Sequence, residues 1–356
     1  MALNVALIGC GLNGRFHSTA IRAIARRGLL DINYAAVCDA DPARASSFAQ
    51  STGATAVTDP REVIDSPDID LVYICVPTAY HKDLVLRAAG RGKHVFCEKP
   101  LATNLADVEE MVQAVDRAGV KAAVGLVLRH SPILTVMKEL MDDSTLGRLM
   151  TIVFRDDQFF PVQGHYGSEW RKDHRLVGSG TLLEHSIHDV DVLRWFGGEV
   201  RSVRGSVGNF AGHPHVEDLA TGHLEFTGGG TAELVSVWHN VLSRPSTRRL
   251  ELFFENGMFA TDHDFFGPIQ IQLGSEPARE LSLEEVVRRY LDLVGLRGEQ
   301  YEQALARYSL EDYFFLTALA EGAEPFPDFA LALEAHRLVD AIYRSAAAGG
   351  GEVTLA

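Results

Sequence analysis

The chain has 356 residues, 46% of them hydrophobic and 23% charged, which is typical of a folded globular protein long enough for two domains. Its 48 acidic residues outnumber 33 basic ones, and the formal charge of −15 argues against nucleic acid or an anionic membrane as a partner. The sequence has no apolar run near the ~20 residues that span a bilayer and no signal-peptide pattern at its start. We therefore expect a cytoplasmic protein whose four scattered cysteines are reduced.

Short apolar runs alternate with helical patterns over the first third of the chain. The runs predict strands over 5–9, 33–39, 70–77, 94–100 and 121–127, with helices over 16–27, 42–51, 80–92 and 105–119. Near-continuous apolar strands that alternate with helices predict an α/β fold with a doubly wound parallel sheet. We assign residues 1–124 to this first domain.

The pattern changes after this point, and we assign residues 125–356 to a second domain. A strand begins near residue 148, a helix covers 180–191, and several strands follow. Gly228-Gly229-Gly230 and Asn256-Gly257 separate neighbouring strands as hairpin turns do. Helices over about 309–321 and 328–347 close the chain. This order predicts a domain built on a mostly antiparallel sheet.

A glycine-rich turn follows the first strand and opens the first helix. The sequence "GCGLNG" at 9–14 has the Gly-x-Gly-x-x-Gly spacing that lets a backbone turn and a helix N-terminus hold a pyrophosphate. An acid at the end of the second strand stands where it would bind the adenosine ribose and repel the extra phosphate of NADP. The sequence thus predicts a Rossmann domain that binds NAD. The residues that we expect to contact NAD here are Gly9, Gly11, Leu12, Asn13, Gly14 and Asp39.

Two further strand ends carry polar residues, and ligands of open α/β sheets bind at the carboxyl ends of strands. The first end contains Pro77, Thr78 and His81, and the second contains Glu98 and Lys99. We expect these residues near the cofactor as well. The ammonium of Lys99 could steady a developing alkoxide or share the proton of a substrate hydroxyl. A surface lysine in a turn is the alternative that spacing alone leaves open.

The stretch "GTLLEHSIHDVD" at 180–191 concentrates histidines and acids in one predicted helix. Glu184, His188 and Asp191 have the i, i+4, i+7 spacing of a single helix face. Three interpretations remain open on the residues alone. The histidine could transfer protons beside a supporting carboxylate. With His185 it could begin a metal site. The helix could also simply have a solvated face.

Together these motifs resemble the glucose–fructose oxidoreductase/inositol dehydrogenase/MocA-type family. The resemblance covers "GCGLNGRFH", "ICVPTAYH" and "CEKPLA", then "LRHSP", "EWRKD", "GSGTLLEHSIHDVDVLRW" and "ENG". It implies a Rossmann domain, a C-terminal α/β domain with a large open sheet, and NAD(P)-linked chemistry on a sugar, inositol or related polyol. The open sheets of this family pair subunits, so a homodimer or homotetramer is expected. Relatives that act as redox-assisted glycosidases or NAD-sensing regulators provide two alternative functions.

The resemblance also implies roles for individual residues. Lys99 matches the active-site lysine and His188 the general acid/base, while Glu184 replaces the usual aspartate that supports this histidine. We expect Asp191, Tyr166 and His185 near substrate, together with Lys99 and His188, and name His165 and His239 as further candidates. Arg129, Trp170 and Arg171 are expected near the cofactor, although a structural salt bridge is an equal alternative for Arg129 and core packing for Trp170. We expect no metal.

Overall fold

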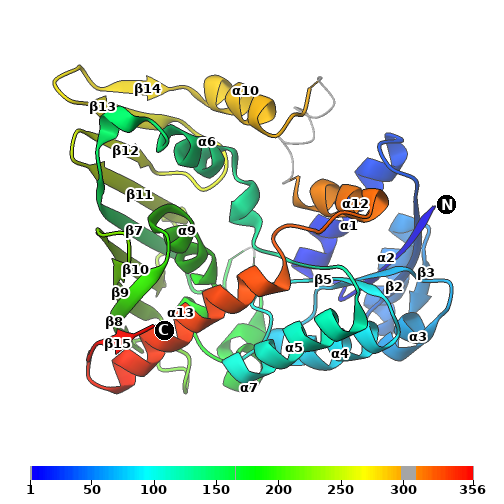
Figure 1. The fold of residues 1–356 in the computed structure, drawn as a ribbon. Coiled ribbons are helices and arrows are strands. Elements are labelled where there is room, and N and C mark those ends of the chain that lie inside the picture. The colour runs from blue at the N-terminus through cyan, green and yellow to red at the C-terminus, as the bar shows by residue number, and fades with distance from the viewer. Residues whose placement is uncertain (1, 165, 298–309, 356) are drawn as a thin grey trace. The chain divides into compact units, whose positions relative to one another are not determined.

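The computed structural model describes residues 2–164, 166–297 and 310–355 (Figure 1). These residues divide into two compact units. Unit 1 comprises Met1–Leu126 and Leu310–Leu333, and unit 2 comprises Val127–Ser309 and Glu334–Ala356.

Unit 1 is built on a six-stranded parallel sheet, which confirms the predicted Rossmann fold. Its strand order is β3-β2-β1-β4-β5-β6. β2 and β3 therefore lie on one side of β1, and β4, β5 and β6 lie on the other side. The strands are β1 (Leu3–Ile8), β2 (Ile32–Cys38), β3 (Thr55–Val57), β4 (Leu71–Ile74), β5 (His94–Cys97) and β6 (Ala122–Val124). The helices are α1 (Leu12–Arg26), α2 (Pro42–Thr52), α3 (Pro60–Asp65), η1 (Thr78–Tyr80), α4 (His81–Gly90), α5 (Leu105–Ala118) and α12 (Glu311–Glu321).

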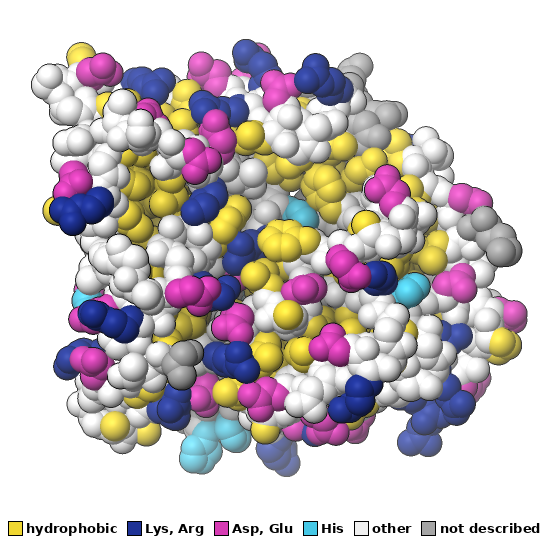
Figure 2. Space-filling model, in the orientation of Figure 1, with side chains coloured by type: hydrophobic (Ala, Val, Ile, Leu, Met, Phe, Trp, Pro, Cys, Tyr) yellow, Lys and Arg dark blue, Asp and Glu magenta, His cyan; other side chains and the backbone are white. Residues whose placement is uncertain are grey.

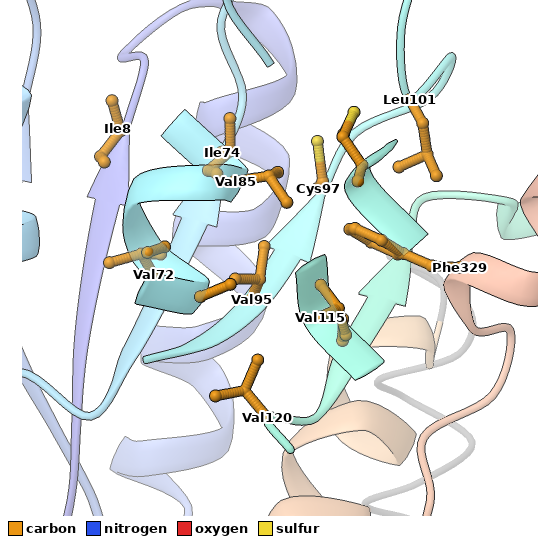
Figure 3. Close-up of a cluster of buried hydrophobic side chains, with 14 of the residues drawn as sticks. Ile8, Val72, Ile74, Val85, Val95, Cys97, Leu101, Val115, Val120 and Phe329 are labelled. Atoms are coloured by element: carbon orange, nitrogen blue, oxygen red, sulfur yellow. The ribbon is translucent and has the colours of Figure 1, made fainter. Parts of the chain in front are cut away.

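Helices cover both faces of this sheet, as the apolar strands predict. On one face, side chains of α3, α4 and α5 pack against alternate residues of the strands, including Val72, Ile74 and Val95 (Figure 3). On the other face, α1, α2 and α12 pack against Leu7 and Tyr73. β3 and α3 were not among the predicted elements.

A late segment of the chain returns to unit 1. α12 packs beside α1, and Phe329, at the start of α13 (Phe329–Ala347), enters the core of the face that α5 covers (Figure 3). The amide of Val124 donates to the carbonyl of Pro327, which fixes this segment at the edge of the sheet. Residues 310–333 therefore lie in unit 1, which differs from the predicted assignment of all of 125–356 to the second domain.

Unit 2 is built on a nine-stranded sheet in which only the β7–β10 pair is parallel. The predicted open, mostly antiparallel sheet is thereby confirmed. Its order is β14-β13-β12-β11-β7-β10-β9-β8-β15. The strands are β7 (Leu149–Phe159), β8 (Val200–Gly208), β9 (Leu219–Phe226), β10 (Thr231–His239), β11 (Thr247–Phe254), β12 (Gly257–Thr261), β13 (Ile269–Leu273), β14 (Arg279–Leu281) and β15 (Val353–Thr354). The described residues of unit 2 also form η2 (Val127–His130), α6 (Pro132–Leu140), η3 (Ser144–Leu146), η4 (Glu169–Lys172), α7 (His174–Val177), α8 (Thr181–Glu184), α9 (Ile187–Gly197), α10 (Leu283–Leu293) and the part of α13 from Glu334 onward.

The two faces of this sheet differ. The inner face, which α8 and α9 cover, begins apolar along β7 with Ile152 and Phe154 and becomes polar at Asp156. Ser236 of β10 and Arg248 of β11 are the sheet neighbours of Asp156, so three polar side chains meet at one end of the inner face. The outer face carries half-exposed residues. Both predicted hairpins are present, as β9–β10 and β11–β12.

No helix in the described ranges combines the length and the apolar character that crossing a bilayer requires. On the face visible in Figure 2, acidic and basic side chains are interspersed.

Candidate active site

The glycine turn of unit 1 has the geometry of a pyrophosphate cradle. Gly9 has a φ of +103°, and a Cβ there would lie 2.4 Å from the carbonyl oxygen of Cys75. A Cβ on Gly14 would lie 2.0 Å from the carbonyl oxygen of Gly9, so both glycines are required by the packing of the turn itself. Gly11, the N-cap of α1, is different, because a Cβ there would meet no atom within 4 Å. The space beside Gly11 and the helix N-terminus that follows, with Leu12 and Asn13, fit a bound pyrophosphate.

Asp39 lies directly after β2, where the sequence places it. Its Oδ2 accepts a hydrogen bond from the amide of Cys10 at 2.9 Å, and its Oδ1 accepts one from the amide of Asp41 at 2.9 Å. The guanidinium of Arg44 lies 3.5 Å from the same carboxylate. Asp39 therefore braces the glycine turn and places a carboxylate at the end of β2, and its contact with the adenosine ribose of NAD stays a prediction.

The loop after β4 is fixed by a buried histidine. Nδ1 of His81 lies 2.9 Å from the carbonyl oxygen of Pro100, and Nε2 lies 2.8 Å from the carbonyl oxygen of Val76. Burial lowers the pKa of His81, although both carbonyls favour its charged form. Thr78 is buried at the start of η1, beside Pro77. The geometry thus gives His81 a bracing role between two strand-end loops, and contact with the cofactor stays a prediction for all three residues.

Glu98 and Lys99 follow β5 and lie beside a buried histidine that the sequence analysis did not identify. Oε1 of Glu98 lies 3.0 Å from Nε2 of His17, and Oε2 accepts from the backbone amide of Lys99 at 3.1 Å. Nδ1 of His17 lies 2.9 Å from Oδ1 of Asp312 in α12. Asp312 lies far along the chain, and no local pattern indicates that it pairs with His17.

The polar stretch 180–191 is not one continuous helix, contrary to the prediction. α8 ends at Glu184 and α9 starts at Ile187, with His185 and Ser186 between them. The interruption has a physical cause, because Ser186 donates a side-chain hydrogen bond to Ser236 of β10, and this contact holds the chain between the helices. The i, i+4 spacing from which we expected Glu184 to support His188 therefore does not apply. His188, near the start of α9, is buried.

Glu184 forms a buried ion pair with Arg171 of η4. Nε of Arg171 lies 2.6 Å from Oε1 of Glu184, and both side chains are enclosed. The guanidinium also lies over the rings of Trp170 and Tyr166, at 4.9 and 5.9 Å from their centroids. Trp170 also packs against the apolar cluster around Trp238. Arg171 thus brings together Glu184, Trp170 and Tyr166 within unit 2, and their contacts with substrate or cofactor stay a prediction. His165, a further candidate, lies outside the described residues.

Arg129 and Asp191 bind each other. Nε and Nη2 of Arg129 lie 2.6 and 2.7 Å from the two carboxylate oxygens of Asp191, and the guanidinium lies 4.8 Å from the centroid of Trp195. Both side chains are buried. This is the structural salt bridge that the sequence left open for Arg129, and it ties η2 to α9. The predicted contacts of Arg129 with cofactor and of Asp191 with substrate would have to compete with this pair.

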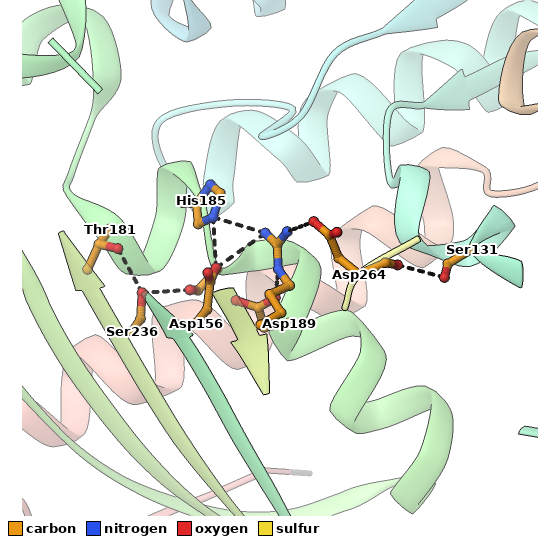
Figure 4. A network of polar contacts seen from close by, with 9 residues as sticks. Ser131, Asp156, Thr181, His185, Asp189, Ser236 and Asp264 are labelled. Atoms are coloured by element: carbon orange, nitrogen blue, oxygen red, sulfur yellow. Dashed lines mark hydrogen bonds and ion pairs between the residues drawn. The ribbon is translucent and has the colours of Figure 1, made fainter. Parts of the chain in front are cut away.

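His185 belongs to a buried network centred on Arg248 (Figure 4). Nε2 of His185 lies 2.7 Å from Asp156 and 2.9 Å from Nη2 of Arg248. Arg248 also binds Asp189 at 2.9 Å and Asp264 at 2.8 Å. Burial raises the pKa of Asp189 to about 7, and the neighbouring charge of Asp156 adds to this effect. One arginine thus holds three carboxylates and a histidine at the polar end of the inner sheet face.

Glu217, which the sequence analysis also missed, anchors the start of α8. Its Oε2 accepts from the amide of Gly180 at 2.7 Å, and its Oε1 accepts from the amide of Leu182 at 3.0 Å and from the hydroxyl of Tyr343 at 2.7 Å. The carboxylate occupies the helix N-terminus, where free amides favour negative charge. An acid within an apolar strand pattern, or directly before one, is the signal that could have identified Asp156 and Glu217.

Comparison with known proteins shows to which protein family this chain is similar. Residues 3–126 match the oxidoreductase family with an NAD-binding Rossmann fold, and residues 134–260 match the GFO/IDH/MocA C-terminal domain. Levoglucosan dehydrogenase of Pseudarthrobacter phenanthrenivorans is 26% identical over 97% of this chain and 96% of its own length. Inositol 2-dehydrogenase of Rhizobium meliloti is 29% identical over 98% of both chains.

Solved structures agree with this match. An oxidoreductase domain protein from Kribbella flavida superposes with a TM-score of 0.86 at 26% identity, over 100% of both chains. Levoglucosan dehydrogenase in complex with NADH and levoglucosan has the same fold, with a TM-score of 0.85 at 24% identity over 99% of both chains. The two matched segments, the glycine turn and the paired sheets together establish that this chain belongs to the Gfo/Idh/MocA family of NAD-binding oxidoreductases.

Proposed function

We propose that this protein is an NAD-dependent dehydrogenase that oxidises a secondary hydroxyl of a sugar, an inositol or a related polyol, or reduces the corresponding ketone. The observation that carries the proposal is full-length similarity to levoglucosan dehydrogenase and inositol 2-dehydrogenase, combined with the presence of both Lys99 and His188. A regulator that only senses NAD has no need of either side chain.

The chemistry divides between the cofactor and the chain. NAD, when bound, accepts the hydride from the carbon that bears the hydroxyl. His188 takes the hydroxyl proton, because an imidazole has an ordinary pKa of ~6.5 and can accept and return a proton near neutrality. The Lys99 ammonium donates a hydrogen bond to the same oxygen and steadies its developing negative charge. We propose that Glu184, whose carboxylate forms an ion pair with Arg171, is the third catalytic residue and supports His188.

The test is a scan of sugars and cyclitols for NAD reduction by the purified protein, with NADP run in parallel. Lys99→Met and His188→Ala should each lower kcat at least about 100-fold, the usual contribution of a general acid or base. The dissociation constant for NADH should stay within about threefold of the wild-type value. Lys121→Met and His223→Ala are matched controls, because Lys121 pairs with Glu324 at the opposite end of the parallel sheet and His223 pairs with Glu233 on the surface of unit 2.

Near-normal turnover in either Lys99→Met or His188→Ala would overturn the proposed roles. Cleavage of a glycoside without net reduction of NAD would instead favour the redox-assisted glycosidase. NADH binding with no turnover of any polyol would favour the NAD sensor.

We also propose that the protein forms a homodimer or homotetramer through the outer face of the nine-stranded sheet. Half-exposed apolar side chains of neighbouring strands, among them Val153, Val235 and Phe253, lie on this face. A broad face of this kind would gain from burial against a second copy. A monomer by sedimentation equilibrium would refute this. We place the reaction in the cytoplasm, where the four free cysteines would stay reduced.

A further inference from the structure

A buried histidine in unit 1 lies between two carboxylates that belong to distant parts of the chain. His17 projects from α1, with Nδ1 2.9 Å from Asp312 and Nε2 3.0 Å from Glu98. The exposed fractions of the three side chains are 6%, 7% and 12% in the order His17, Asp312, Glu98. A carboxylate oxygen faces each ring nitrogen, and the charged imidazolium, which has a hydrogen on both nitrogens, can donate to both carboxylates at once.

The elements packed around His17 favour that charge. α12 contributes Glu311 as well as Asp312, and β4 contributes the ring of Tyr73, 5.5 Å from the imidazole centroid. Burial alone lowers the pKa of His17, but Asp312 and Glu98 hold it well above its usual range. Burial raises the pKa of Glu311 well above its usual range, so burial disfavours the charged form of this acid. The group therefore contains one imidazolium between two carboxylates.

The Glu98 carboxylate connects this group to the reactive lysine. Oε1 of Glu98 is held by His17, while Oε2 accepts from the backbone amide of Lys99 at 3.1 Å. The opposite side of the carboxylate is limited by Gly125, where a Cβ would lie 3.0 Å from Oε2. His17 thus determines where the Glu98 carboxylate can lie, and Glu98 in turn holds the peptide unit that carries Lys99.

We propose that His17, anchored by Asp312, is a positioning residue that holds Glu98 against the Lys99 amide and neutralises the Glu98 charge beside the Lys99 ammonium. This rests on the proposed function of Lys99. Without the imidazolium, Glu98 would be an uncompensated anion next to Lys99. An uncompensated anion stabilises the charged ammonium, so Lys99 would hold its proton to a higher pH. The backbone of Lys99 would also be held less firmly, because the Glu98 carboxylate that accepts from its amide would no longer be fixed by His17.

The chain suits a direct measurement because it has only six lysines. With ε-¹³C-labelled lysine, the Lys99 signal is identified as the one missing from Lys99→Met, and its titration is followed by NMR. In His17→Gln, the Lys99 midpoint should rise by half a pH unit or more while the other five signals stay unchanged. Asp312→Asn, which keeps the side-chain size, should shift the midpoint in the same direction by less.

A matched control separates positioning from general loss of stability. Asp70→Asn removes a carboxylate that binds the amide and side chain of Asn4, at the opposite end of the same sheet. This variant should lower the melting temperature and leave the Lys99 midpoint unchanged. Imidazole ¹⁵N spectra of the wild-type protein at pH 7.5 should show both nitrogens of His17 protonated, which tests the premise without any variant.

The outcomes separate this proposal from the proposed function. With the polyol that the scan identifies, His17→Gln should lower kcat about tenfold or more, with the NADH dissociation constant within about threefold. An unchanged Lys99 midpoint in folded His17→Gln, a neutral His17, or an unchanged kcat beside an inactive Lys99→Met would each overturn the positioning role. An active Lys99→Met would instead refute the function of Lys99, and the NMR midpoint would then decide the role of His17 alone.

Discussion

Replacing Asp189 with asparagine is expected to flatten the pH dependence of stability near neutrality. The Asp189 side chain is completely buried, its Oδ1 accepts from Nε of Arg248 at 2.9 Å, and it faces the buried carboxyl of Asp156. Two facing carboxyls in a buried place can share a proton, and burial raises the pKa of Asp189 to about 7. Asparagine keeps the size of the protonated acid and supplies a permanent donor toward Asp156.

The sign follows from the unfolded value of 3.8 and the folded value of about 7. Between these values the folded chain binds a proton at Asp189 that the unfolded chain has lost. The contribution of Asp189 to the free energy of unfolding is therefore fully present below 3.8 and falls as the pH rises through about 7. At about 1.4 kcal/mol per pH unit, raising the pH from 5 to 8 should cost the wild type about 2–3 kcal/mol through this group.

Urea unfolding at pH 5.0 and 8.0 measures this difference directly. The change between the two pH values should be about 2–3 kcal/mol smaller in Asp189→Asn than in the wild type. Asp157→Asn is the matched control, because Arg244 holds the carboxyl of Asp157 in an ion pair and keeps its pKa lowered despite partial burial. Asp157 therefore stays ionised between pH 5.0 and 8.0 in both the folded and the unfolded chain. Equal pH dependence in the wild type and Asp189→Asn would refute the reasoning.

Three further substitutions test other parts of the site. Gly180→Ala should lower the free energy of unfolding by at least about 2 kcal/mol in urea titrations, because its Cβ would lie 1.8 Å from the Glu217 carbonyl oxygen; full stability would contradict that contact. Asp39→Ser should raise the ratio of kcat/KM for NADP to that for NAD at least about tenfold, and an unchanged ratio would separate Asp39 from cofactor choice. Glu184→Gln should cost about 3 kcal/mol by leaving Arg171 buried without its charged partner, and a calorimetric melting temperature equal to wild type would argue against the pair.

The fold of unit 1 was predictable because its strands are buried on both faces. Val72 and Val95 lie in near-continuous apolar runs, and such runs bounded by turn residues have few alternatives. The short β3 strand was missed because two of its three residues, Thr55 and Ala56, are exposed and give no apolar pattern. The return of residues 310–333 to unit 1 was missed for another reason, because helical periodicity says that a helix has a buried face but not which sheet covers it.

The sequence predicted which polar residues the candidate site contains better than it predicted which residues they contact. The local pattern placed Glu184 and His188 on one helix face, but the hydroxyl of Ser186 binds Ser236 on a strand that follows later in the chain, and the helix is interrupted there. Propensity and spacing carry no information about such a contact.

Asp156 of unit 2 is an acid at an inward position of a buried strand, and the sequence pattern alone indicates this. Strand alternation identifies Asp156 as inward and Asp157 as outward once the apolar residues of β7 fix the inner face. An inward acid in a buried strand requires a partner, because burial of an unpaired charge is costly. The sequence therefore implies that a cation or a shared proton must reach Asp156, although only the strand register reveals that Arg248 is opposite. An acid at an inward position of an apolar strand therefore indicates a candidate site residue as directly as a recognised motif does.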